Sequence, residues 1–194
     1  MKKIVLASKS PRRKELLGNI GVKFSVIEGD VDESIVPKNL EPKLYVQELA
    51  VLKANSSARK SGKHALVIGA DTVVIHDKNV LGKPADLEEA RLMLKTLSGD
   101  THYVYTGIAV LDTDSMKIVS DYEKTAVTFR ELSDMEIDNY VKKYRPTDKA
   151  GAYGIQEFAG VFVSSVEGDY FNIVGLPVCR LYTLIKEEFG EELS

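Results

Sequence analysis

The chain has 194 residues, of which 44% are hydrophobic and 28% charged, and its formal net charge is -3. This composition is typical of a globular protein, and we expect residues 1–194 to form a single domain. The charge balance excludes a general nucleic-acid binder, the single cysteine excludes an internal disulfide, and the short apolar runs exclude a membrane span, so we expect a cytoplasmic protein with no nucleic-acid or membrane partner.

A strand and a helix are the first elements expected. Ile4–Leu6 is apolar, Ser10 fits the N-cap of the helix, and Pro11 fits its first position. A helix N-terminus favours acidic residues, yet this one carries Arg12 and Arg13. Two guanidiniums beside unpaired backbone N–H groups predict a phosphate site. The alternative is that both arginines only extend over the surface.

Strands and helices alternate up to Leu97. We expect a strand over 23–28, a helix over 43–61, a buried strand over 65–75, a turn over 76–79 and a helix from Asp86 to Leu97. Lys53 lies at the edge of the apolar face of the second helix. Cys179, which has apolar neighbours, is expected to be a buried thiol.

The remaining elements indicate a mixed sheet. We expect antiparallel strands within 101–127 joined at 112–115, a helix over 133–144, a loop over 147–156, a hairpin of 161–166 with 171–174, and a terminal helix from Pro177 to about Phe189. The histidines His64, His76 and His102 lack paired-ligand spacing and are expected at surface or turn positions without a role. The sum is an α/β domain with two lobes about a central cleft.

Asp71 interrupts the apolar run of the central strand. An uncompensated buried carboxylate costs several kcal/mol. If the strand ends near 69–72 instead, Asp71 emerges at a sheet edge, where α/β folds bind ligands. The alternative is a structural carboxylate that caps a helix or pairs with a buried lysine.

Further charged residues suit a metal and phosphates. Glu33 and Asp71, with Asp30 or Asp32 near the first, could hold a divalent cation that also contacts phosphates. Lys83 precedes a proline that keeps its segment extended. A Walker loop is excluded, because it would need glycine at position 77 and serine or threonine at position 84.

Several segments resemble the Maf family in order and spacing, and the resemblance covers almost the whole chain. They are Ala7–Arg13, Gly69–Thr72, Leu81–Pro84, Leu97–Gly99, Asp148–Gln156, Gly168–Tyr170 and Val174–Pro177. The resemblance implies a nucleoside triphosphate pyrophosphatase that cuts between the α and β phosphates with a divalent metal, Mg²⁺ or Mn²⁺. It also implies an elongated mixed sheet with flanking helices, similar to the inosine triphosphate pyrophosphatases, and a homodimer.

The resemblance also implies a role for each matching residue. Asp71 would be the proton acceptor and, with Glu33, a metal ligand, while Arg12, Thr72 and Gln156 would select the substrate and Arg13, Lys53 and Lys83 would surround the triphosphate. The Gly-Ile-Gln ending is similar to the subgroup that acts on dTTP and UTP. Many relatives continue with glycine-rich sequence, whereas this chain has Glu157–Ala159. A regulator of septum formation that binds nucleotides with little turnover is the alternative.

Overall fold

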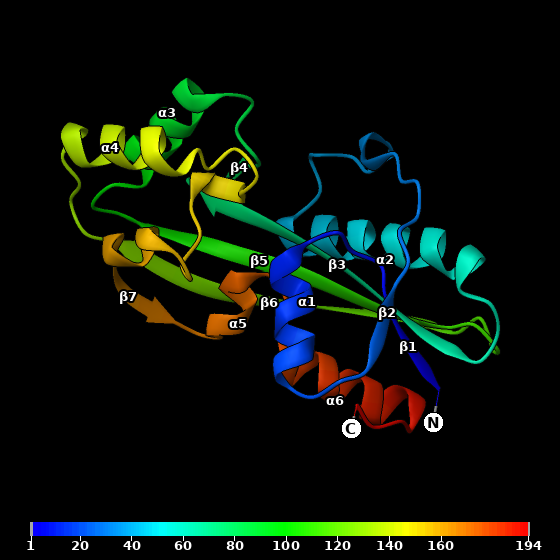
Figure 1. The fold of residues 1–194 in the computed structure, drawn as a ribbon. Helices are drawn as coiled ribbons and strands as arrows, with labels where there is room; N and C mark the ends of the chain where they lie inside the picture. Colours follow the sequence, from blue (N-terminus) through cyan, green and yellow to red (C-terminus); the bar gives the residue numbers. More distant parts are fainter. Residues whose placement is uncertain (1, 194) are drawn as a thin grey trace. The chain divides into compact units, whose positions relative to one another are not determined.

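The computed structural model describes residues 2–193 and contains a seven-stranded sheet (Figure 1). The strands are β1 (Lys3–Leu6), β2 (Phe24–Val26), β3 (Ala65–His76), β4 (Asn79–Leu81), β5 (Thr101–Asp112), β6 (Ile118–Phe129) and β7 (Val163–Glu167). Their order is β2-β1-β3-β5-β6-β7, and β4 pairs with β3. Because β1 is parallel to both β2 and β3 whereas β4 and β7 pair in antiparallel fashion, the sheet is mixed, as predicted.

Helices flank the sheet. They are α1 (Pro11–Asn19), α2 (Pro42–Ser61), α3 (Leu87–Leu97), α4 (Asp134–Tyr144), α5 (Tyr170–Val174) and α6 (Val178–Phe189), with 3-10 turns η1 (Glu33–Ile35), η2 (Ala150–Ala152) and η3 (Phe158–Phe162). The predicted helices over 43–61, 86–97 and 133–144 are confirmed, the last with the reciprocal capping bonds between Ser133 and Glu136. Within residues 2–193, every helix is too short or too polar to cross a membrane.

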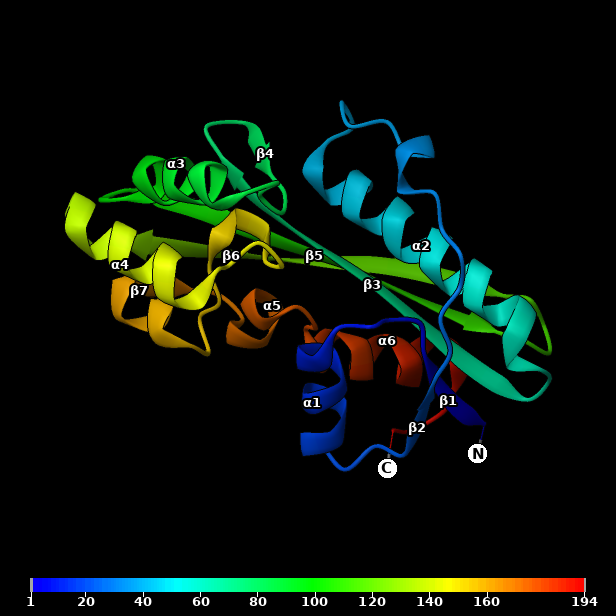
Figure 2. The same cartoon turned by 45° about the horizontal axis from the view of Figure 1, so that its top comes forward.

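The chain divides into two compact units. The first unit comprises residues up to Asp71, Thr106–Glu123 and the segment from Gly175 onward, and the second comprises Thr72–Tyr105 and Lys124–Val174. In the first unit, α2 lies on one side of β3 and α6 on the other (Figures 1 and 2). Small and β-branched residues fill the space between α2 and the strands, among them Val5, Ala50, Ala54, Val67 and Ala109.

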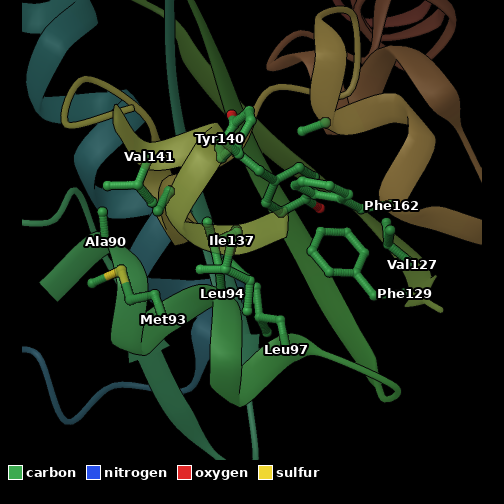
Figure 3. Packing of buried hydrophobic residues seen from close by; sticks show 14 of the residues in the cluster. Ala90, Met93, Leu94, Leu97, Val127, Phe129, Ile137, Tyr140, Val141 and Phe162 are labelled. Atoms are coloured by element: carbon green, nitrogen blue, oxygen red, sulfur yellow. The ribbon is translucent and has the colours of Figure 1, made fainter. Parts of the chain in front are cut away.

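The core of the second unit contains several aromatic rings (Figure 3). The apolar faces of α3 and α4 pack together, and Leu94, Leu97 and Ile137 are almost fully buried there. Phe129 and Phe162 are about as deeply buried, and their ring centroids lie 6.0 Å apart. This core anchors the loop over 147–156, because Ala152 and Tyr153 of that loop belong to it.

The predicted hairpin of 161–166 with 171–174 is wrong. Residues 163–167 do form β7, but it pairs with β6, and residues 170–174 form α5. Asp169 Oδ1 accepts a hydrogen bond of 2.7 Å from the Phe171 N–H and so begins a helical turn. The buried Asn172 donates to Val104 O and Thr125 Oγ1, which fixes that turn against β5 and β6.

Three expectations about burial are also wrong. Cys179 is exposed, because α6 turns Val178, Leu181, Leu184 and Ile185 inward and leaves the cysteine on its outer face. His76 and His102 are buried rather than at surface or turn positions, and His102 Nε2 lies 2.7 Å from Tyr153 Oη.

Candidate active site

Asp71 lies within β3, not at its end. The strand expected over 65–75 is confirmed and continues to His76, so Asp71 does not emerge at a strand end near 69–72. Asp71 is instead compensated by a lysine: Lys53 Nζ lies 2.5 Å from Asp71 Oδ1, with side-chain exposures of 18% and 14%. The pairing with a buried lysine, weighed above as a structural alternative, is therefore present. It also brings together two residues that the family resemblance assigns to catalysis and to the triphosphate.

Close packing of α2 on the strands brings Lys53 to Asp71. A Cβ at Gly69 would lie 2.2 Å from Ala50 O, and a Cβ at Gly107 would lie 2.2 Å from Val46 O. Only glycine allows the helix backbone to rest directly on β3 and β5 at these points. Lys53 follows Ala50 by three residues, so its side chain projects from nearly the same face of α2.

The segment before α2 adds Glu33 to the same place. Lys53 Nζ lies 2.9 Å from Glu33 Oε1 as well, so one ammonium contacts two carboxylates. The segment is tied to α2 because Ser56 Oγ donates to Asp30 O over 2.9 Å. Asp32 accepts from the Ser34 N–H and begins η1, which places Glu33 at the start of that turn. The Asp32 carboxylate is thus used in this turn, whereas the Asp30 carboxylate is exposed and lies 3.3 Å from Lys60 Nζ.

Arg13 connects the N-terminus of α1 to β3. Ser10 is the N-cap, as predicted, and accepts from the Arg13 N–H. The Arg13 guanidinium donates from Nη1 to Ala70 O over 2.9 Å and from Nε to Gly175 O over 2.8 Å. Ala70 O is the carbonyl that directly precedes Asp71. Arg13 therefore fixes the backbone beside the carboxylate, a role that sequence reasoning missed because it depends on strand pairing.

The charges of these residues shift the pKa values of two other side chains. Burial lowers the pKa of Arg13 and the nearby Arg12 lowers it further, whereas the charge of Asp71 opposes both. Burial raises the pKa of Tyr45 on α2, and the charges of Asp71 and Glu33 raise it more. Tyr45 therefore stays neutral near Asp71 and Glu33. Nothing in the sequence indicated that this tyrosine, which precedes Lys53 on α2, lies near the two carboxylates.

In the second unit, the other predicted residues lie on adjoining segments. Thr72 follows Asp71 on β3, and Lys83 and Gln156 are exposed. The Gly151 N–H donates to Gly82 O over 3.1 Å, which ties the loop that carries Gln156 to the segment that carries Lys83. A Cβ at Gly151, where φ is +66°, would lie 3.0 Å from Val74, so this loop also rests on β3.

Glu33 and Asp71 suit a divalent metal. Both carboxylates already converge on the cationic Lys53 nitrogen, and carboxylate oxygens are the ligands that Mg²⁺ and Mn²⁺ accept while they also bind phosphates. Another group, His76, Asp77 and Asp100, presents ligand atoms within 4.8 Å of one another. There the two imidazole nitrogens face different carboxylates, so one ion could not replace both contacts. The first pair therefore fits a metal better.

Comparison with known proteins places this geometry in context. The family model described as Maf-like protein matches residues 3–188. A dTTP/UTP pyrophosphatase of Thermoanaerobacter sp. (strain X514) is 51% identical over 191 residues, which cover 98% of this chain and 99% of the relative. One of Caldanaerobacter subterraneus subsp. tengcongensis is 52% identical over 188 residues, covering 97% and 90%. One of Bacillus cereus is 46% identical over 187 residues, covering 96% of each.

Solved structures give a more distant likeness. The Ham1 protein of Staphylococcus aureus has a TM-score of 0.46 and 17% sequence identity, over 66% of this chain and 72% of that protein.

Proposed function

The chain belongs to the Maf family, and we propose that it hydrolyses dTTP and UTP to the nucleoside monophosphate and pyrophosphate. The relatives that share about half of its residues over nearly its full length carry that name. The observation in the structure that supports it best is the meeting of Lys53 with the carboxylates of Asp71 and Glu33, because a triphosphate hydrolase needs both a cationic group and acidic groups at one point.

We propose that the basic residues bind the triphosphate. Arg12, Lys53 and Lys83 would neutralise phosphate oxygens, which lets water approach the α phosphorus and stabilises the leaving pyrophosphate. Arg13 would contribute through its charge and by holding α1 against Ala70. The N-terminus of α1, with its backbone N–H groups, adds to the same positive field. No covalent intermediate is needed, since charge and positioning supply most of the acceleration.

Asp71 is the proposed general base. Its carboxylate would orient the attacking water and accept a proton from it as the oxygen bonds to the α phosphorus. Asp71 and Glu33 would hold the divalent cation, Mg²⁺ or Mn²⁺, which when bound supplies charge neutralisation for the phosphates and lowers the pKa of nearby water. Arg13 keeps Asp71 in register by bonding the preceding carbonyl, so that the carboxylate approaches the substrate from a fixed backbone.

Gln156 and Thr72 are the proposed selectors of the base, together with Arg12. A glutamine amide offers one donor group and one acceptor, which match the imide edge of uracil or thymine. A base with a different edge would leave the amide or its own polar groups unpaired, and this costs binding energy. Modified pyrimidine triphosphates that keep the imide edge fit the same requirement, which suits a house-cleaning role.

Setting and assembly follow from the same proposal. We place the protein in the cytoplasm, where nucleoside triphosphates are made and used. A homodimer is the proposed assembly. The net charge of -3 on each chain argues against nucleic acid as a partner.

The test is a panel of canonical and modified nucleoside triphosphates, each assayed with Mg²⁺ and with Mn²⁺, in which monophosphate and pyrophosphate are both quantified. We expect equal amounts of the two products, the highest kcat/KM for UTP and dTTP, and loss of turnover with EDTA. Release of inorganic phosphate with a nucleoside diphosphate would contradict the assigned bond. Tight nucleotide binding with negligible turnover would instead favour the regulator of septum formation.

A further inference from the structure

The loop that carries Gln156 is closed by an ion pair between its two ends. Lys149 lies near the start of the loop over 147–156 and Glu157 directly follows its last residue, and Lys149 Nζ lies 3.3 Å from Glu157 Oε1. Lys149 Nζ also donates to Asp148 Oδ1 over 2.8 Å. The ammonium is thus shared between the residue before it and the residue after Gln156.

Lys149 is an unusual lysine because its side chain is only 8% exposed. Lysines are seldom buried to this degree unless a carboxylate compensates the charge. Both partners are more exposed than the lysine, with 62% for Asp148 and 41% for Glu157. The aliphatic stem therefore lies inside the loop while the carboxylates close over its charged end.

The backbone of the loop is built around this stem. A Cβ at Gly154 would lie 2.9 Å from Lys149 Cε, so the glycine rests directly on the lysine. The Glu157 N–H then donates to Gly154 O over 3.0 Å, which forms the turn that contains Gln156. The position of Gln156 is therefore set from inside by Lys149 and from the end by Glu157.

The two residues after Glu157 attach the loop to α4 and the core. The Phe158 ring stacks on Tyr144 with centroids 5.3 Å apart and an interplanar angle of 17°. Ala159 is fully buried. Glu157 also faces α4, because its charge adds to burial in raising the pKa of Tyr140. Each residue of Glu157–Ala159 thus fixes the end of the loop in a different way.

We propose that the Lys149–Glu157 pair is a positioning device that holds Gln156 in place and thereby sets the preference for uracil and thymine bases. The inference rests on the proposed function for the role of Gln156 alone. Neither Lys149 nor Glu157 is assigned to the triphosphate or to proton transfer. Loss of the pair should therefore change recognition of the base rather than the chemical step.

The test compares Glu157→Gln with Asp148→Asn, which is the matched control. It also includes Lys149→Met and the double variant Lys149→Met/Glu157→Gln, which show whether the two residues act as a pair. In Glu157→Gln we expect the KM for UTP to rise about tenfold, kcat to change less than about twofold, and the ratio of kcat/KM for UTP over CTP to fall about tenfold. Asp148→Asn removes the other carboxylate that contacts Lys149 but keeps the Lys149–Glu157 pair, and should change the ratio much less. The double variant should resemble the single variants, because all three lack the same pair.

Hydrogen exchange of the amides over 150–157 without nucleotide provides the independent readout. We expect exchange in Glu157→Gln to be about tenfold faster there and unchanged in β3. Unchanged exchange in the loop would overturn the positioning device. Faster exchange with an unchanged UTP to CTP ratio would overturn its link to base preference. A wild-type protein that does not turn over UTP would contradict the proposed function, whereas the exchange measurement would still test the loop.

Discussion

Lys53 Nζ lies 2.5 Å from the carboxylate of Asp71 and 2.9 Å from that of Glu33. The lysine therefore acts as the internal counter-ion of two acidic residues that the proposed mechanism assigns to the metal. Removing Lys53 leaves two neighbouring carboxylates without compensation, whereas removing either carboxylate leaves the lysine paired with the other. This arrangement connects the stability of the first unit with its chemistry.

Replacement of Asp71 with asparagine should abolish most of the turnover. The amide keeps the shape of the side chain but cannot accept the proton, so we expect kcat for UTP to fall by about two to four orders of magnitude. Steady-state kinetics at saturating Mg²⁺ measure this, and circular dichroism confirms that the variant is folded. Turnover within a factor of a few of wild type would remove Asp71 from the mechanism.

Replacement of Lys53 with glutamine should have opposite effects on metal and nucleotide. Without the ammonium, Asp71 and Glu33 are open to a divalent cation, so we expect tighter Mn²⁺ binding in the absence of nucleotide, by about tenfold. The KM for UTP should rise, because a phosphate contact is lost. Mn²⁺ titration followed by electron paramagnetic resonance checks the first effect. Weaker or equal Mn²⁺ binding in this variant would show that the lysine does not compete with a metal.

Replacement of Gly69 with alanine should separate α2 from β3. Its Cβ would lie 2.2 Å from Ala50 O, a backbone atom that cannot move alone, so we expect unfolding free energy to fall by about 3 kcal/mol and activity to fall with it. Gly18→Ala in α1 is the matched control, since a Cβ there has no atom within 4 Å. It should raise stability by about 0.5–1 kcal/mol. Urea unfolding of both variants measures these changes in unfolding free energy. Equal changes in the two variants would contradict the close packing of α2 on β3.

His102 should make stability depend on pH in the weakly acidic range. Burial and, to a lesser extent, the charge of His76 together lower the pKa of His102 to about 4, and the charge of Asp100 opposes them. The unfolded chain binds the proton near its usual value of about 6.5, whereas the folded protein does not until about pH 4. The contribution is therefore fully present above about pH 6.5 and is lost as the pH falls towards about 4, with a slope of at most about 1.4 kcal/mol per pH unit.

The comparison of wild type with His102→Gln isolates that proton. Glutamine can still bond to Tyr153 but does not titrate, so unfolding free energies measured in urea between pH 7.5 and pH 4.5 should fall less steeply in the variant. Parallel curves for the two proteins would contradict the assignment to His102.

Local signals in the sequence predicted the elements they concern. Ser133 with Glu136 predicted the start of α4, and Ser10 with Pro11 predicted that of α1, because a cap and its partners lie within one turn of each other. Phe171–Val174 was mistaken for a strand because its apolar residues have no clear period over so short a stretch. The segment is helical because the turn begins at Asp169 and the long-range hydrogen bonds of Asn172 hold it in place.

The site was predictable in its residue types but not in its contacts. Asp71 stood out as a carboxylate in an apolar strand, yet its partner Lys53 comes from a helix whose approach depends on Gly69 and Gly107. Such contacts between distant segments leave no periodic trace in one sequence. The same holds for Lys149, whose pairing with Glu157 requires the fold of the whole loop.

The most direct test of the account is a single-turnover hydrolysis of UTP in water enriched in oxygen-18, followed by mass spectrometry of both products. If water attacks the α phosphorus beside Asp71, the uridine monophosphate gains one labelled oxygen and the pyrophosphate gains none. Label in the pyrophosphate, or in released inorganic phosphate, would contradict attack at the α phosphorus.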